Sequence, residues 1–220
     1  MRLATIQRGG EEIVAVLVPG GVLPVDQIRD PDGDGWPVDL LSLLESGRLD
    51  ELQSHVDGLG ADAERLSARA TLYGEVEYGP LYRRPRKIWG IGLNYVEHAG
   101  DLEEIAPSEE PASFMRPDTT IIGPGAKIRL PGQSERVTGE AELGLIIGRG
   151  AKNVSEEEAP SVVAGLTTIL DMTAEDILRK NPRYLTREEL RHLFQLRAAA
   201  RDAGRGGGDT ELNSRYRPER

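Results

Sequence analysis

Residues 139–148 read Gly-Glu-Ala-Glu-Leu-Gly-Leu-Ile-Ile-Gly, the clearest strand pattern in the chain. Successive side chains of a strand point to opposite faces, so Glu140 and Glu142 share one face, about 7 Å apart. The opposite face is apolar throughout, from Ala141 to Ile147. The pattern predicts a strand with one acidic face and one apolar face.

A third carboxylate follows a later apolar run, because Asp171 comes directly after residues 166–170. Neighbouring carboxylates repel each other unless a cation lies between them. Three carboxylates suit Mg²⁺, Mn²⁺ or Ca²⁺ and suit zinc poorly. The sequence therefore suggests a metal site formed by Glu140, Glu142 and Asp171. The spacing alone leaves a plainer alternative open, an ordinary half-exposed strand whose glutamates face water.

His98 and Asp101 are three residues apart, which places them on one side of a helical turn. A carboxylate beside an imidazole orients the ring and raises its basicity, as a general base requires. The alternative is a surface histidine beside an acidic loop. The glycines at 90 and 92 lack the spacing of a phosphate-binding loop, which argues against nucleotide binding.

The amino-acid composition argues against several classes of binding partner. The chain has 37 acidic and 27 basic residues and a formal net charge of −10, which argues against nucleic acid. It contains no cysteine, which excludes disulfides and thiolate metal sites. The N-terminus lacks an apolar signal region, and no apolar run reaches membrane-spanning length. These features predict a cytoplasmic protein without a membrane partner.

The rest of the chain predicts a succession of strands and helices. Before residue 70, strands are expected at 3–7 and 13–18, followed by a second apolar stretch at 22–28, and helices are expected at 40–44 and 49–56. Further strands are expected at 88–92, 119–122, 126–130, 141–147 and 166–170. Further helices are expected at 94–102, at 155–164 after a Ser155–Glu158 capping box, and from about residue 173.

Four stretches in order, residues 87–99, 111–117, 139–148 and 170–176, resemble the fumarylacetoacetate hydrolase family. The combination of Asn-Tyr-x-x-His at 94–98 with Glu-x-Glu and a distal aspartate is specific. The resemblance implies that Glu140, Glu142 and Asp171 are the ligands of a divalent cation, with Mg²⁺ the first choice and Mn²⁺ or Ca²⁺ as alternatives. It also implies that His98 activates a water or accepts a proton, with Asp101 where many members carry glutamate.

The same resemblance assigns substrate binding to Asn94, Tyr95 and Arg116. Arg116 stands where the family usually has lysine, and Glu175 where many members have arginine. Arginine binds a carboxylate as a planar fork, so we expect the shape of the substrate to differ from that of other members. Both departures point to a subgroup of the family.

The fold class implied is α+β, a mixed β-roll with peripheral helices, preceded by a small N-terminal α+β domain. Family members are usually homodimers that cleave or isomerise small keto acids, such as β-diketo acids, acylpyruvates and oxaloacetate-like acids. The metal acts as a Lewis acid on the developing enolate. The acidic segment 101–111 is expected to be a lid over the site.

The resemblance ends at about Arg187, where the family normally continues. Residues 188–198, back-translated and shifted by one nucleotide, can encode Lys-Ser-Phe-Asp-Thr-Phe-Phe-Ser-Phe-Gly-Pro, which is typical of the family at this place. We therefore expect a truncation or frameshift, an incomplete roll and a disordered, out-of-frame tail.

The predicted organisation has four parts: an N-terminal domain at 1–70, a linker at 71–85, a partial catalytic domain at 86–187 and the tail at 188–220. Two alternatives to an active enzyme remain, an inactive fragment and a non-catalytic acidic binding module.

Overall fold

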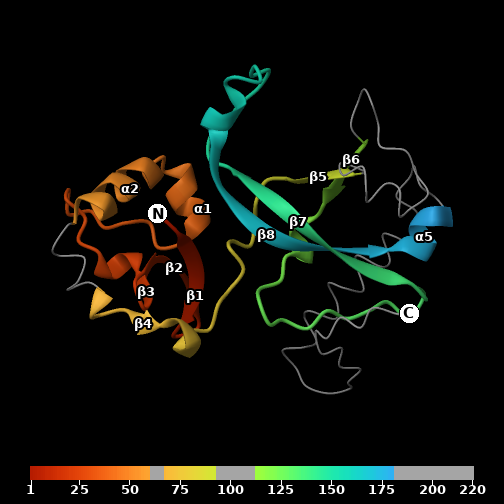
Figure 1. The fold of residues 1–220 in the computed structure, drawn as a ribbon, viewed down its shortest axis with the longest axis horizontal. Coiled ribbons are helices and arrows are strands. Elements are labelled where there is room, and N and C mark those ends of the chain that lie inside the picture. The colour runs from red at the N-terminus through yellow and green to blue at the C-terminus, as the bar shows by residue number, and fades with distance from the viewer. Residues whose placement is uncertain (60–66, 93–111, 181–220) are drawn as a thin grey trace. The chain divides into compact units, whose positions relative to one another are not determined.

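The computed structural model describes residues 1–59, 67–92 and 112–180 (Figure 1). Several predicted features therefore lie outside the described residues: Asn94, Tyr95, His98, Asp101, the helix at 94–102, the lid at 101–111 and the tail at 188–220. The chain divides into two compact units, one of Met1–Tyr82 with Ile122–Arg220 and one of Arg83–Ile121.

The N-terminal part begins with a four-stranded antiparallel sheet in the order β1-β2-β3-β4. Its strands are β1 (Leu3–Arg8), β2 (Glu11–Val18), β3 (Gly21–Pro24) and β4 (Thr71–Leu72). Its helical elements are η1 (Val25–Gln27), α1 (Leu40–Glu45), α2 (Leu49–Gly58) and η2 (Tyr73–Glu75). The strands and helices expected before residue 60 are thus confirmed in kind, although the run from Val22 to Ile28 divides into β3 and η1.

The middle strand, β2, is buried on both faces. Val14 and Val16 pack with residues of α1 and α2, including Leu43 and Leu52, in the larger core cluster. Ile13 and Ala15 belong to a second cluster on the other face. Burial on both faces explains why the sequence shows a continuous apolar run here instead of alternation.

Residues of the predicted linker pair with this sheet. Thr71 lies opposite Val22 and Leu72 opposite Gly21, and Tyr78 forms an isolated bridge with Ile6. A Cβ on Gly21 would lie 2.2 Å from the Thr71 carbonyl oxygen, so the close approach of β4 requires glycine there. The domain boundaries at 70 and 85 stay a prediction.

The unit of residues 83–121 contains an antiparallel pair, β5 (Ile88–Gly92) and β6 (Ala112–Arg116), followed by η3 (Asp118–Thr120). β5 confirms the strand expected at 88–92. The strand expected at 119–122 is wrong. There Ile121 N donates to Asp118 O and Thr120 Oγ1 donates to Pro117 O, so local turn bonds replace strand pairing.

The other long elements are β7 (Val137–Ile147) and β8 (Val163–Ala174), joined by a segment that includes η4 (Ala159–Val162), and α5 (Glu175–Lys180). Figure 1 shows β7 and β8 as a long twisted pair, which we call the β7–β8 ribbon. Both predicted strands and the helix near residue 173 are confirmed.

Two expectations in this region are wrong. Residues 126–130 form no strand with any described partner, because the chain turns at Gly125 (φ 76°) and Ala126 N donates to Gly123 O. The helix expected at 155–164 is only a turn followed by η4, since Pro160 lacks the N–H that a helix interior needs. The predicted capping contacts exist nonetheless, with Ser155 N donating to Glu158 Oε2 at 3.1 Å and Glu158 N to Ser155 Oγ at 3.3 Å.

None of the helices in the described ranges combines the length and apolar character that crossing a bilayer requires.

Candidate functional site

The register of the β7–β8 ribbon brings the predicted carboxylates onto one face. Glu140 lies directly opposite Asp171 in the antiparallel ladder, and Glu142 lies opposite Ile169. Directly opposed residues share a face, with Cβ atoms about 4.5–5.5 Å apart, and diagonal neighbours are about 7–8 Å apart. Glu140, Glu142 and Asp171 thus share what we call the acidic face.

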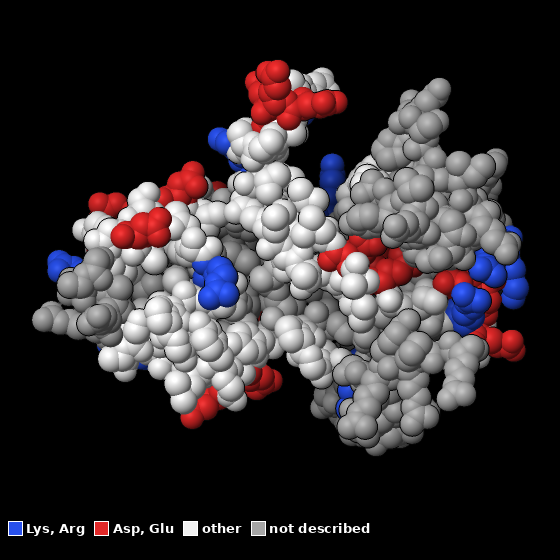
Figure 2. All heavy atoms as spheres, in the orientation of Figure 1, with Lys and Arg blue, Asp and Glu red and all other residues white. Residues whose placement is uncertain are grey.

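The acidic face is only partly accessible to solvent. All three carboxylate residues have intermediate burial. Figure 2 shows acidic side chains gathered over the middle of the ribbon, and a second acidic group over the segment that connects β7 to β8. This register places the carboxylates of Glu140 and Asp171 directly opposite one another, and two neighbouring carboxylates are a setting that favours a cation.

The opposite face of the ribbon is apolar and exposed. Its main side chains are Leu143, Leu145, Ile147, Leu166 and Leu170, all between 53% and 64% exposed. The alternation predicted from the sequence is confirmed, with acidic and apolar side chains on opposite faces.

Arg116, the predicted substrate residue in the other unit, ends β6 opposite Ile88. Its guanidinium carbon lies 5.0 Å from the centre of the Phe114 ring on the same strand. An arginine stacked on an aromatic ring keeps its planar fork of donors in a defined orientation. Such a fork suits a carboxylate ligand.

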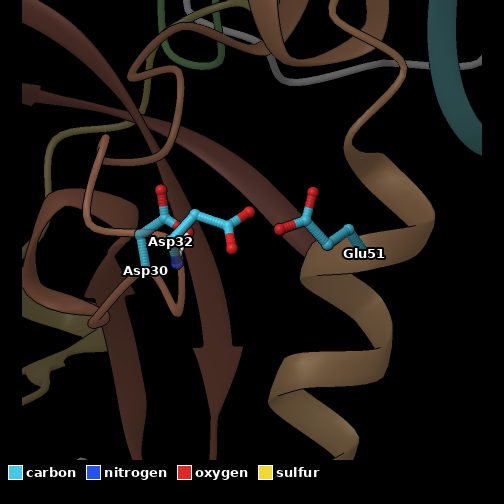
Figure 3. A group of neighbouring side chains, drawn as sticks. All are labelled: Asp30, Asp32 and Glu51. Atoms are coloured by element: carbon cyan, nitrogen blue, oxygen red, sulfur yellow. Dashed lines mark hydrogen bonds between the residues drawn. The ribbon is translucent and has the colours of Figure 1, made fainter.

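A different acidic cluster lies in the N-terminal part, where Asp30, Asp32 and Glu51 have ligand oxygens within 4.8 Å of one another. Figure 3 shows Asp30 and Asp32 side by side in the loop, facing the side chain of Glu51, which projects from α2. No pattern in the sequence indicates these residues, because they occur in a loop and a helix without a recognisable spacing.

Arg48 gives this second cluster a structural explanation. Its guanidinium donates to Glu51 Oε2 and Oε1 at 2.8 and 2.7 Å and to Asp30 Oδ1 and Oδ2 at 2.9 and 3.3 Å. It also donates to Gly35 O at 3.1 Å and lies 4.5 Å from the Trp36 ring centre. These contacts use all five guanidinium donors.

The charge of the second cluster is therefore largely compensated from within. Hydrogen bonds from Arg48 lower the pKa of both Asp30 and Glu51, and those carboxylates raise the pKa of Arg48. A divalent cation would have to compete with a guanidinium that is already bound. We assign this cluster to the stability of the N-terminal part.

Comparison with known proteins identifies the class. Residues 87–194 match the family described as fumarylacetoacetate (FAA) hydrolase C-terminal. Over 93 residues the chain is 43% identical to the mitochondrial oxaloacetate tautomerase fahd2 of Xenopus laevis, a match that covers 42% of this chain and 28% of that protein. Residues 87–194 thus belong to the fumarylacetoacetate hydrolase family.

Solved structures support the same fold. A maleylpyruvate hydrolase from Sphingobium sp. SYK-6, in complex with manganese(II) and pyruvate, has a TM-score of 0.55 and 23% identity, over 79% of this chain and 59% of that one. A 5-carboxymethyl-2-hydroxymuconate delta-isomerase from Mycobacterium smegmatis also has a TM-score of 0.55 and 23% identity, over 84% and 60%. The Xenopus laevis relative is an oxaloacetate tautomerase, so the family includes enzymes.

The chain spans only part of the proteins that it matches. It covers 40%, 41% and 38% of the length of three curated archaeal relatives. The family match runs to residue 194, past the predicted boundary at Arg187, so that boundary and the out-of-frame tail stay predictions.

Proposed function

We propose that this chain carries the metal-binding part of an enzyme that cleaves or isomerises small keto acids, such as acylpyruvates or oxaloacetate-type acids. The observation that carries the proposal is the register that sets Glu140 opposite Asp171, with Glu142 on the same face. Three carboxylates from two adjacent strands form an oxygen-rich donor set of the kind that Mg²⁺ and Mn²⁺ prefer.

A divalent cation held by these carboxylates would supply a Lewis acid for the enolate that develops as a keto acid reacts. Arg116 binds the carboxylate of the substrate through its fork of donors, and Asn94 and Tyr95 contact the substrate. His98 takes a proton or activates a water, oriented by Asp101. The metal is Mg²⁺ or Mn²⁺, with Ca²⁺ an alternative, and the intact enzyme is a cytoplasmic homodimer.

Titration of the full chain with Mn²⁺, measured by calorimetry, tests the metal site directly. We expect Glu140→Gln to weaken Mn²⁺ binding by more than about 10²-fold, since even outer-shell changes cost 10–100-fold. The control is Glu156→Gln, which alters an exposed glutamate in the segment between β7 and β8. Equal Mn²⁺ affinity in the wild type and Glu140→Gln would refute the proposed site.

Turnover tests the chemistry separately. With Mn²⁺ or Mg²⁺ bound, the chain should convert an acylpyruvate or an oxaloacetate-type acid. His98→Ala should lower kcat by roughly 10²–10⁴-fold while Mn²⁺ affinity is retained, as expected for loss of a general base. Metal binding without turnover would instead favour the inactive fragment or the acidic binding module.

A further inference from the structure

The chemistry proposed for the ribbon depends on its strand register, so the features that set the register matter. A tight two-residue turn fixes the register of a hairpin. Here β7 and β8 are joined by the long segment 148–162. The ladder also has an irregularity between Ile146 and Ile147, at the end nearest that connection. At that end Gly148 N donates to Val162 O at 2.9 Å, on the far side of the irregularity from the acidic pair.

Burial of a face is the other common determinant of register, because a one-residue slip moves every side chain to the opposite face. The apolar face of the ribbon is exposed, with Leu143 and Leu170 at 53% and 57%. An interaction outside the ladder can therefore help to hold this register.

The opposite end of the ribbon supplies such an interaction. The ladder ends at the pair Val137 and Ala174 and continues as one backbone bond, with Glu175 N donating to Arg136 O at 3.0 Å. The Arg136 guanidinium then pairs with Glu175, with 2.6 Å between Nε and Oε2. The Glu175 side chain is only 9% exposed, so this ion pair is partly shielded from water.

Asp176 makes a second connection to the segment before β7. Ser134 Oγ donates to Asp176 Oδ1 at 2.6 Å, and Glu135 N donates to Asp176 Oδ2 at 2.9 Å. The two bonds join residues 42 and 41 positions apart. Together with the Arg136–Glu175 pair, they form what we call the clamp.

The clamp holds both strands at fixed points close to the acidic pair. Glu140 is three residues after Val137 and Asp171 three before Ala174, a distance of about 10 Å along each strand. A slip of one residue would turn Asp171 away from Glu140, and a slip of two would separate them by about 7 Å.

We propose that Glu175 and Asp176 are positioning residues, which through Arg136 and Ser134 hold β7 and β8 in the register that sets Glu140 opposite Asp171. Their use in metal binding rests on the proposed function, whereas their effect on register does not. Neither side chain needs to contact the metal or the substrate.

Disulfide trapping tests the register without any metal. The chain has no cysteine, so an engineered pair is unambiguous. Ala141 and Leu170 are opposed in the observed ladder, whereas Leu143 and Leu170 would be opposed only after a two-residue slip. Directly opposed Cα atoms lie within the range that a disulfide spans, and diagonal ones lie at or beyond its limit.

In an otherwise unchanged chain, the pair A141C and L170C should oxidise readily, and the pair L143C and L170C should oxidise little. Adding Glu175→Gln and Asp176→Asn should raise the yield of the slipped pair several-fold. These substitutions preserve side-chain shape and so limit the risk of unfolding. An unchanged ratio of the two yields would overturn the proposal.

Mn²⁺ affinity then connects the clamp to the site. Asp176→Asn should weaken Mn²⁺ binding by about 10–100-fold, the range expected for outer-shell groups. The charge exchange Arg136→Glu with Glu175→Arg should recover part of any loss caused by Glu175→Arg alone. The matched control is Glu158→Gln, since Glu158 also accepts hydrogen bonds from a serine, at the connecting end of the ribbon.

The outcomes separate the two proposals. Loss in Asp176→Asn, no loss in Glu158→Gln and recovery by the charge exchange would support the clamp as a positioning device. Normal Mn²⁺ affinity in Asp176→Asn would overturn that role while leaving the metal site intact. A wild-type chain that binds no Mn²⁺ would end the proposed function, and disulfide trapping would still decide whether the clamp sets the register.

Discussion

The N-terminal part buries its large apolar side chains, whereas the β7–β8 ribbon exposes many of its own on one face. In the N-terminal part, Leu43 and Leu52 are fully buried between helices and sheet. On the ribbon, Leu143 and Leu145 are 53% and 59% exposed. The first region is stabilised by a core of its own, whereas the second is specified by strand pairing and by polar contacts at one end.

Folding stability and the proposed chemistry therefore depend on different regions of the chain. Burial of large apolar side chains supplies the main favourable free energy of folding, so the N-terminal part should dominate the unfolding transition. The candidate ligands lie on the ribbon, where register rather than burial determines which side chains meet. Substitutions in the two regions should therefore affect different measurements.

The largest effect expected on stability is that of Leu43→Ala. Removing this fully buried side chain should lower the free energy of unfolding by about 2–5 kcal/mol. The matched substitution Leu143→Ala, on the exposed face of the ribbon, should change it by no more than about 0.5 kcal/mol. Urea denaturation followed by circular dichroism measures both. A comparable loss for Leu143→Ala would mean that this face is covered in solution, which would break the comparison.

An intermediate effect is expected for Gly90→Ala in the unit of residues 83–121. A Cβ at this position would lie 2.2 Å from the Phe114 ring on the neighbouring strand, so the ring or the strand must move. Overpacking of this kind costs about 1–3 kcal/mol. The double variant Gly90→Ala with Phe114→Leu should recover part of the loss. Thermal unfolding measures both, and an unchanged melting temperature in Gly90→Ala would show that the Phe114 ring moves aside at little cost.

The effect of Arg48→Met on stability should depend on pH. Because hydrogen bonds from Arg48 lower the pKa of Asp30 and Glu51, the stability they contribute is complete above the ordinary values of 3.8 and 4.5. It is lost as pH falls through the lowered values of the folded state.

The melting temperature of Arg48→Met should therefore differ most from that of the wild type near pH 7 and least near pH 3. The control is Arg8→Met, which removes an exposed pair with Asp26 and should change the melting temperature little at either pH. A difference for Arg48→Met that stayed constant with pH would show that the contact with Trp36, rather than the carboxylates, carries the effect of Arg48.

Local patterns predicted the elements whose side chains have one dominant environment. The run in β2 and the alternation in β7 were recognisable because burial imposes a period on the sequence. Local pattern failed at 155–164, where the Ser155–Glu158 contacts formed but Pro160 prevented a helix. It also failed at 119–122, where a β-branched run forms a turn after Pro117.

The partners of Asp176 could not be predicted from the sequence either. The sequence indicates Asp176 only as a residue of the helix expected from about residue 173, and Ser134 lies 42 residues earlier with no pattern that connects the two. Arg136 and Glu175 are likewise far apart in sequence, because both strands and the segment between them lie between these two residues. Contacts between distant residues leave no local period, so only the folded chain reveals them.

The sequence by itself determined that Glu140 and Glu142 share a face of a strand, because side-chain alternation is a property of the extended backbone. It also determined the family, through short motifs in a constant order. Only the tertiary structure decided that Asp171 lies opposite Glu140 and that the clamp, rather than a tight turn, holds that pairing. Register arises from hydrogen bonds between segments far apart in the chain, and its energy depends on which segments meet.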